Sequence, residues 1–182
     1  MKTIFFETSN LYIQDGSMDE YEIGQTREFD IGAIALTQFE KTDTQTSYYE
    51  HIKDADYKIC GSVYRKYDCF AFMSLGDLNV VICKGAEDLE EGVFYTAVVR
   101  FAYDIWNCYH LEMRSTPDIA QNGTVKSIKL DTSMPIRSEK YQNALTKDGV
   151  ERKYDVNLQK TSCWADEEIG NGICNYLIEV QV

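Results

Sequence analysis

The sequence predicts a mainly β fold, arranged as a small curled antiparallel sheet or a small barrel, with additional hairpins and at most one or two short helices. Aromatic residues make up 13% of the 182 residues, and tyrosine occurs 13 times. Tyrosine, valine, isoleucine and phenylalanine favour the pleated, half-buried surface of a strand, whereas proline, which disfavours strands, occurs only twice. Turn signals containing glycine separate the apolar runs. A hydrophobic content of 44% is typical of a chain that forms a packed core.

Alternating and continuous apolar runs indicate where the strands lie. The clearest hairpin is centred on Gly76-Asp77, because this pair can adopt the positive φ of a tight turn. Gly61 lies inside the preceding run and predicts a bulge or a bend that lets a small sheet curl. In chain order, the expected strands are 3–6, 10–13, 27–38, 57–64, 69–74, 78–83, 93–103, 108–113, 123–130, 154–159 and 174–182.

The segments between these runs have their own signatures. The run 93–103 is apolar on both faces, which is typical of a central or strongly bent strand. A helix is expected over 138–147, and residues 160–182 are expected to form a hairpin with an acidic tip. No repeat, linker or shift of composition divides the chain. We therefore expect a single β-rich domain over residues 1–182, with a barrel-like core at about 56–113.

The segment 56–110 combines a strand with an interior glycine, a hairpin across Gly76-Asp77, an acidic link at 85–92 and a long strand that ends in aromatic residues. This pattern resembles the OB-fold-like small β-barrels of uncharacterised bacterial proteins. The resemblance implies a module that binds single-stranded nucleic acid by stacking bases on aromatic rings along a basic groove. The aromatic candidates are Tyr64, Tyr67, Phe70, Phe72, Tyr103, Trp106 and Tyr109, and the positive charges nearby are Arg65, Lys66 and Arg100.

The overall charge disfavours that activity. Thirty acidic residues against 18 basic ones give a net charge of −12, which repels phosphates and anionic lipids and attracts a basic protein. Between Lys2 and Glu7 there are only three apolar residues, too few for a secretory signal, and no run is long enough to span a membrane. We therefore expect a cytoplasmic protein with reduced cysteines and no membrane association, for which nucleic acid is a disfavoured partner.

Few residues point to catalysis. The chain has two histidines, His51 and His110, and His110 shares an expected strand face with Cys108. A Cys–His pair two residues apart on a strand is wider than a direct hydrogen bond, and paired ligands at zinc spacing are absent. Nucleotide, hydrolase and calcium-loop motifs are absent too. No catalytic residue, metal site or cofactor is expected.

Two acidic clusters are the remaining candidates for a site. Each combines carboxylates with an apolar residue: Glu87, Asp88, Leu89, Glu90 and Glu91 in the first, and Trp164, Asp166, Glu167 and Glu168 in the second. The carboxylates of a solvated loop keep a protein soluble, which is the simplest interpretation. In the functional interpretation they attract a basic protein partner, and Leu89 or Trp164 is buried on contact.

The leading hypothesis is therefore a non-catalytic acidic binding protein, possibly an immunity or antitoxin-type inhibitor of a basic protein such as a nuclease. Three alternatives stay open. They are an OB-like module for single-stranded nucleic acid, an enzyme with an unmarked carboxylate site, and a subunit of a homo-oligomer that pairs through edge strands such as 174–182.

Overall fold

The computed structural model describes residues 2–14, 16, 18–103, 119–133, 152–162 and 174–182. They belong to two compact units. The first combines Met1–Arg27 with Gly123–Val182, and the second is continuous from Glu28 to Asn122. The predicted mainly β fold is confirmed, and the helix found among the described residues has five residues. The expectation of a single domain stays a prediction.

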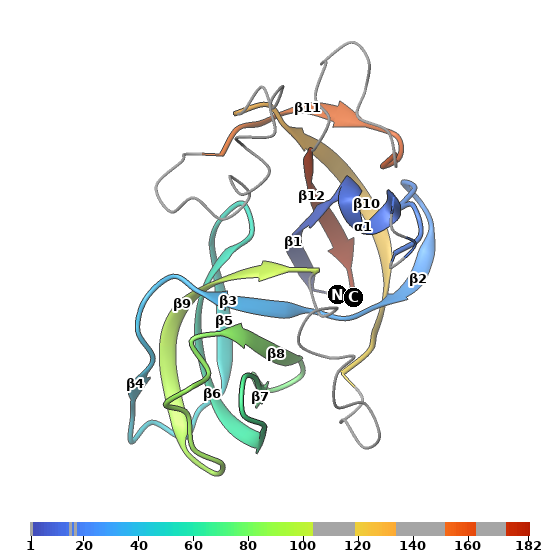
Figure 1. The fold of residues 1–182 in the computed structure, drawn as a ribbon. Helices are drawn as coiled ribbons and strands as arrows, with labels where there is room; N and C mark the ends of the chain where they lie inside the picture. The colour runs from blue at the N-terminus through green and yellow to red at the C-terminus, as the bar shows by residue number, and fades with distance from the viewer. Residues whose placement is uncertain (1, 15, 17, 104–118, 134–151, 163–173) are drawn as a thin grey trace. The chain divides into compact units, whose positions relative to one another are not determined.

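The second unit is a closed five-stranded barrel (Figure 1). Its strands are β3 (Gly32–Ala35), β6 (Asp56–Lys66), β7 (Ala71–Ser74), β8 (Asn79–Lys84) and β9 (Phe94–Ala102). Antiparallel pairing joins β8 to β7, β7 to β6 and β6 to β9. β3 closes the barrel, because it pairs antiparallel with β9 on one side and parallel with β8 on the other.

The barrel differs in one respect from the expected core at 56–113. Its closing strand, β3, precedes this range in the chain and is the parallel partner of β8. Two further strands, which the sequence did not predict, lie beside the barrel strands. β4 (Glu40–Lys41) pairs with β9, and β5 (Tyr48–Lys53) pairs with β6.

β9 is the central strand of this unit, as its two apolar faces predicted. It pairs with β3, β4 and β6. Its alternate residues Tyr95, Ala97, Val99 and Phe101 are buried. The ring of Phe101 stacks on that of Tyr57 from β6, with 4.2 Å between the ring centroids. Burial of such side chains is the main stabilising contribution to a barrel of this size.

Gly61 is the point at which β6 changes partners. Before it, Asp56–Cys60 pair with β5, and after it, Ser62–Lys66 pair with β7. A Cβ at Gly61 would lie 2.4 Å from the carbonyl oxygen of Ser74 and 2.7 Å from Cδ2 of Leu75. The backbone of β7 therefore approaches β6 more closely than would be possible if position 61 held any residue other than glycine. The bulge or bend predicted at Gly61 stays a prediction, since the register of the β6–β7 pair shifts further along, between Val63 and Arg65.

The first unit is an antiparallel sheet in the order β11–β10–β12–β1. These strands are β1 (Thr3–Ser9), β10 (Gln121–Asp131), β11 (Tyr154–Leu158) and β12 (Asn175–Gln181). The two chain ends lie side by side (Figure 1), because Lys2 and Val182 exchange backbone hydrogen bonds of 3.1 and 2.9 Å.

β12 lies between β1 and β10, which corrects two expectations. It is not an edge strand that a second copy of the chain can extend. Nor does it form a hairpin with the segment from Lys160, which makes an isolated bridge to Glu22 instead. Tyr176, Ile178 and Val180 are buried on one face of β12, so the apolar alternation reflects a central position.

Two expectations near the N-terminus are also corrected. Residues 10–13 belong to the short helix α1 (Asn10–Gln14), because Ser9 Oγ accepts a hydrogen bond from the amide of Leu11 and so caps the first turn. The expected strand 27–38 divides into β2 (Thr26–Phe29) and β3. The expected helix 138–147 and strand 108–113 lie outside the described residues.

A buried ion pair holds the end of β10 in the first unit. Asp131 Oδ2 accepts a 2.7 Å hydrogen bond from Arg152, and the two side chains are 3% and 13% exposed. Asp131 Oδ1 accepts hydrogen bonds from the amide and the hydroxyl of Ser133. Burial alone would raise the pKa of Asp131, but the hydrogen bonds from Ser133 and the charge of Arg152 hold it below its usual value.

A half-buried tyrosine lies on the neighbouring strand. Tyr154 of β11 donates a hydrogen bond from its hydroxyl to the carboxylate of Glu7 on β1. Burial and the charge of Glu7 raise the pKa of Tyr154, so its hydroxyl stays protonated and acts as a donor.

We predict that Gly61→Ala lowers the free energy of unfolding by about 2–3 kcal/mol, because the added methyl group overlaps a backbone carbonyl that cannot move independently of β7. Urea unfolding followed by circular dichroism measures the change. Ser62→Ala, at a half-buried neighbour on the same strand, is the control and should stay within about 0.5 kcal/mol of the wild type. Equal stability of the two variants would contradict the close approach.

We also predict that Asp131→Asn costs about 2–4 kcal/mol at neutral pH, because Arg152 then loses its anionic partner in a buried site. The folded-state pKa of Asp131 is below its unfolded value. The stabilisation by the carboxylate is therefore complete above a pH of about 4 and is lost as pH falls through the folded-state pKa. Urea unfolding at several pH values should show the difference between variant and wild type narrowing on acidification. A constant difference would contradict the assignment.

Candidate functional site

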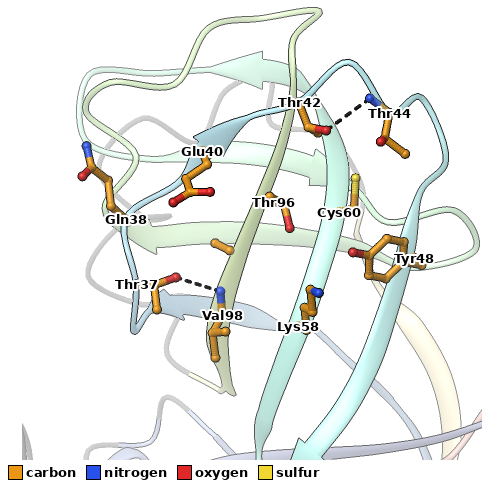
Figure 2. Close-up of a pocket in the computed structure, with 11 residues that line it drawn as sticks. Thr37, Gln38, Glu40, Thr42, Thr44, Tyr48, Lys58, Cys60, Thr96 and Val98 are labelled. Atoms are coloured by element: carbon orange, nitrogen blue, oxygen red, sulfur yellow. Dashed lines mark hydrogen bonds between the residues drawn. The ribbon is translucent and has the colours of Figure 1, made fainter.

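A polar groove of about 410 Å³ lies on the outer surface of the barrel unit, over strands β9 and β6. A row of cross-strand neighbours crosses it. Glu40 of β4 pairs with Thr96 of β9. Thr96 pairs with Cys60 of β6, which in turn pairs with Tyr48 of β5. Figure 2 shows Glu40 and Tyr48 on opposite sides, with Thr96 and Cys60 between them. Since paired strands are about 4.8 Å apart, the row spans about 14 Å.

Strand alternation places these side chains outward. The buried residues of β6 at this level are Tyr57 and Ile59, so Lys58 and Cys60 project from the opposite face. The same rule applies on β9, where Thr96 alternates with buried neighbours. β4 and β5, which are additional to the barrel strands, form the two sides of the groove.

Three threonine hydroxyls in the groove have their hydrogen-bonding directions set by the backbone. Thr37 Oγ1 accepts a 2.9 Å bond from the amide of Val98, and Thr42 Oγ1 accepts a 3.2 Å bond from the amide of Thr44 (Figure 2). Thr96 Oγ1 donates a 2.9 Å bond to the carbonyl of Ile59. A hydroxyl has one hydrogen and two lone pairs. Thr37 and Thr42 therefore keep a donor for a ligand, and Thr96 keeps an acceptor.

The charges of the groove balance. Among the described residues that line it, Glu40 is the one acid and Lys58 the one base. Both are exposed, and neither makes an ion pair or side-chain hydrogen bond within the described part of the chain. The Cys60 side chain at the floor is 1% exposed, and burial raises the pKa of its thiol, so it adds no charge. The described residues that line the groove therefore carry no net charge.

The acidic turn, residues 85–92, is the second candidate feature, and it is firmly attached to the barrel. Ala86 and Leu89 are buried, and the amide of Leu89 donates a 3.1 Å bond to the carbonyl of Ala86. The amide of Gly92 donates a 2.7 Å bond to the carbonyl of Val63 on β6. Gly85 has a φ of +87°, which glycine adopts without strain. These contacts give the turn a defined conformation.

The four carboxylates of the acidic turn differ in their surroundings. Glu90 forms a 2.8 Å ion pair with Lys41 of β4, which lowers the pKa of Glu90 and raises that of Lys41. Glu91 accepts a 2.7 Å hydrogen bond from the amide of Lys66. The side chains of Glu87 and Asp88 are exposed and, within the described residues, make no hydrogen bond or ion pair. All four residues are exposed, and Glu87 and Asp88 are the two whose carboxylates have no partner among the described residues.

The sequence-predicted site residues are only partly brought together. Leu89 is 1% exposed and belongs to the barrel core, so in this conformation its side chain is not presented to a partner. Trp164, Asp166, Glu167 and Glu168 lie outside the described residues, as do Cys108 and His110. His51 is exposed on β5, and its Nε2 lies 2.8 Å from the carbonyl oxygen of Asp54.

The aromatic residues proposed to stack nucleic-acid bases serve different roles. Phe70 and Phe72 are fully buried in one cluster with Val81 and Ile119. Tyr67 packs on Phe70, with 4.7 Å between the ring centroids. Tyr64 is 38% exposed and Tyr103 is half-buried, while Trp106 and Tyr109 lie outside the described residues.

The basic residues near these aromatics have protein partners. Arg100 makes two hydrogen bonds, of 2.7 and 3.1 Å, to the carboxylate of Asp56. Lys66 donates to the backbone carbonyl of Glu87, and the Arg65 guanidinium lies 5.7 Å from the ring centre of Tyr67. Of these three positive charges, that of Arg100 is therefore paired with a carboxylate, as a nucleic-acid groove would not require.

Within the described part of the chain, no three His, Cys, Asp or Glu residues are grouped so that they can hold a metal ion. No described helix has the length and apolar character needed to cross a membrane. The described cysteines, which are Cys60, Cys69, Cys83 and Cys174, are free thiols.

Comparison with protein-family models, curated proteins and solved structures finds no match to this chain. The site is therefore interpreted from its own geometry.

The sequence analysis missed the groove because its two sides come from strands that carry a weak signal. β4 has two residues, and β5 has no alternation of buried and exposed positions. One signal was available. Threonines recur at 37, 42 and 44 in a polar stretch, and Thr96 lies within an otherwise apolar strand. A hydroxyl at such a position indicates a face of the strand that is not packed in the core.

We predict that Leu89→Ala lowers the free energy of unfolding by about 2–4 kcal/mol, as expected when a buried leucine is truncated and leaves a cavity. Thermal or urea unfolding gives the value. Glu87→Ala in the same turn is the control, and its effect should be within about 0.5 kcal/mol. A neutral Leu89→Ala would mean that the leucine is not part of the core.

Proposed function

We propose that this protein is a non-catalytic binding protein that engages a basic protein partner through its acidic turn. The observation that carries the proposal is the pair of exposed carboxylates, Glu87 and Asp88, on a turn held by buried Ala86 and Leu89. A turn that is already ordered loses little conformational entropy on binding, which favours a contact at this position.

The electrostatics of the chain support the same proposal. The net charge of −12 attracts a cationic protein over a distance set by ionic strength, and Glu87 and Asp88 are available for its lysines and arginines. An immunity or antitoxin-type inhibitor of a basic toxin is the specific form that we propose for this activity. The groove lining has one carboxylate, Glu40, among the described residues, whereas glycoside hydrolysis by two acids requires a pair.

The closed five-stranded barrel supports the OB-like assignment, which we keep as part of the proposal. Nucleic-acid binding is the less favoured function of such a barrel here. Phe70 and Phe72 are in the core, and Arg100 is paired with Asp56. Two of the expected stacking rings and one of the expected positive charges are therefore not available to bases in the described part of the chain.

The test uses the full chain immobilised as bait in a lysate of its source organism, at about 50 mM and about 500 mM salt, because screening is severe at the higher value. We expect a basic protein to be retained at low salt and weakened at high salt. After purification of that protein, Glu87→Lys with Asp88→Lys should slow its association rate at least about tenfold, since opposite charges are replaced by like charges.

The matched control combines Asp19→Lys with Glu28→Lys, which replaces two exposed carboxylates elsewhere and has the same net charge. It should slow association much less. Equal slowing by both double variants would assign the effect to overall charge and not to the acidic turn. Failure to retain any basic protein at low salt would refute the proposal.

A further inference from the structure

We propose that the polar groove over β9 and β6 is a binding site for a neutral carbohydrate. This site is separate from the acidic turn, and the inference does not depend on the proposed protein partner. It starts from the row Glu40–Thr96–Cys60–Tyr48 and the hydroxyls next to it.

The available hydrogen-bonding groups match those of a sugar. Thr37 and Thr42 each retain a hydroxyl donor, and Thr96 retains an acceptor, on oxygens held in place by bonds to the backbone. Glu40 adds two acceptor oxygens and Lys58 adds donors. Each sugar hydroxyl both donates and accepts, so neighbouring hydroxyls of one ring can satisfy this mixed set. A ligand with donors only or acceptors only cannot.

The charge balance argues for a neutral ligand. Glu40 and Lys58 carry one charge of each sign, and the Cys60 thiol is neutral. A phosphate or a polycation would leave one of the two unfavourably placed. Tyr48 adds an aromatic side chain at one side of the groove (Figure 2), and such a ring offers an apolar face to the C–H groups of a sugar.

The strand pairing argues against an extended peptide in the same place. Peptides that add to a sheet bond to unpaired strand edges. The groove crosses four strands that are already paired with one another, so its floor presents side chains in place of free backbone groups. The volume of about 410 Å³ and the span of about 14 Å suit one or two sugar rings.

The experiment is a titration of the ¹⁵N-labelled full chain with cellobiose, maltose, lactose and N,N′-diacetylchitobiose, each up to about 20 mM, which detects dissociation constants on the order of 1 mM. We expect at least one of these sugars to shift amide resonances of residues 37–48, 58–60 and 96–98. Thr96→Val, which keeps the shape of the side chain but removes its acceptor, should weaken binding about threefold to tenfold. Tyr48→Ala should weaken sugar binding more than Thr96→Val does.

Two matched variants serve as controls. Thr3→Val changes an exposed threonine on β1, and Tyr64→Ala changes an exposed tyrosine of β6 that does not line the groove; both should bind as the wild type does. Glu87→Lys with Asp88→Lys should also bind the sugar normally, which separates this inference from the proposed protein partner.

The inference is overturned if none of the four sugars shifts the groove amides. It is equally overturned if Thr96→Val and Tyr48→Ala bind as the controls do, or if a lysine hexapeptide shifts these amides and the sugars do not.

Discussion

The close approach of two strands at Gly61 is the constraint on which the barrel depends. β6 pairs with β5 before this residue and with β7 after it, so one strand belongs to two neighbouring pairs. The carbonyl of Ser74 occupies the space that any side chain at Gly61 would need. A residue without a Cβ is therefore required at this point, where β6 passes close to the backbone of β7.

The change of β6 from β5 to β7 as its partner also bears on the groove. Since β5 follows only the first half of β6, and β4 follows only the first part of β9, the outer face between them is open to solvent. Thr96 and Lys58 project into this opening, while Tyr57 and Val99 face the core. Each strand thus contributes to the core with one face and lines the groove with the other.

The two units solve the problem of buried polar groups in similar ways. In the first unit, Asp131 is buried but is paired with Arg152 and bonded to Ser133. In the barrel unit, the half-buried Arg100 is matched by the half-buried Asp56 at the end of the β6–β9 pair. Such pairing offsets the cost of desolvation, so these charges contribute to a defined structure. The exposed carboxylates of Glu87 and Asp88 carry no such structural role within the described residues.

The sequence by itself determined the β class, most strands of the barrel and the turn at Gly76, because alternation and turn chemistry are local properties. It also placed the acidic turn on the surface. Only the tertiary structure decided that β3 closes the barrel, that β12 is a central strand and that Leu89 is buried. The groove could not be predicted from local sequence patterns either. Glu40 and Tyr48 become neighbours of Thr96 and Cys60 through strand pairing between distant segments, and no local pattern specifies such pairing.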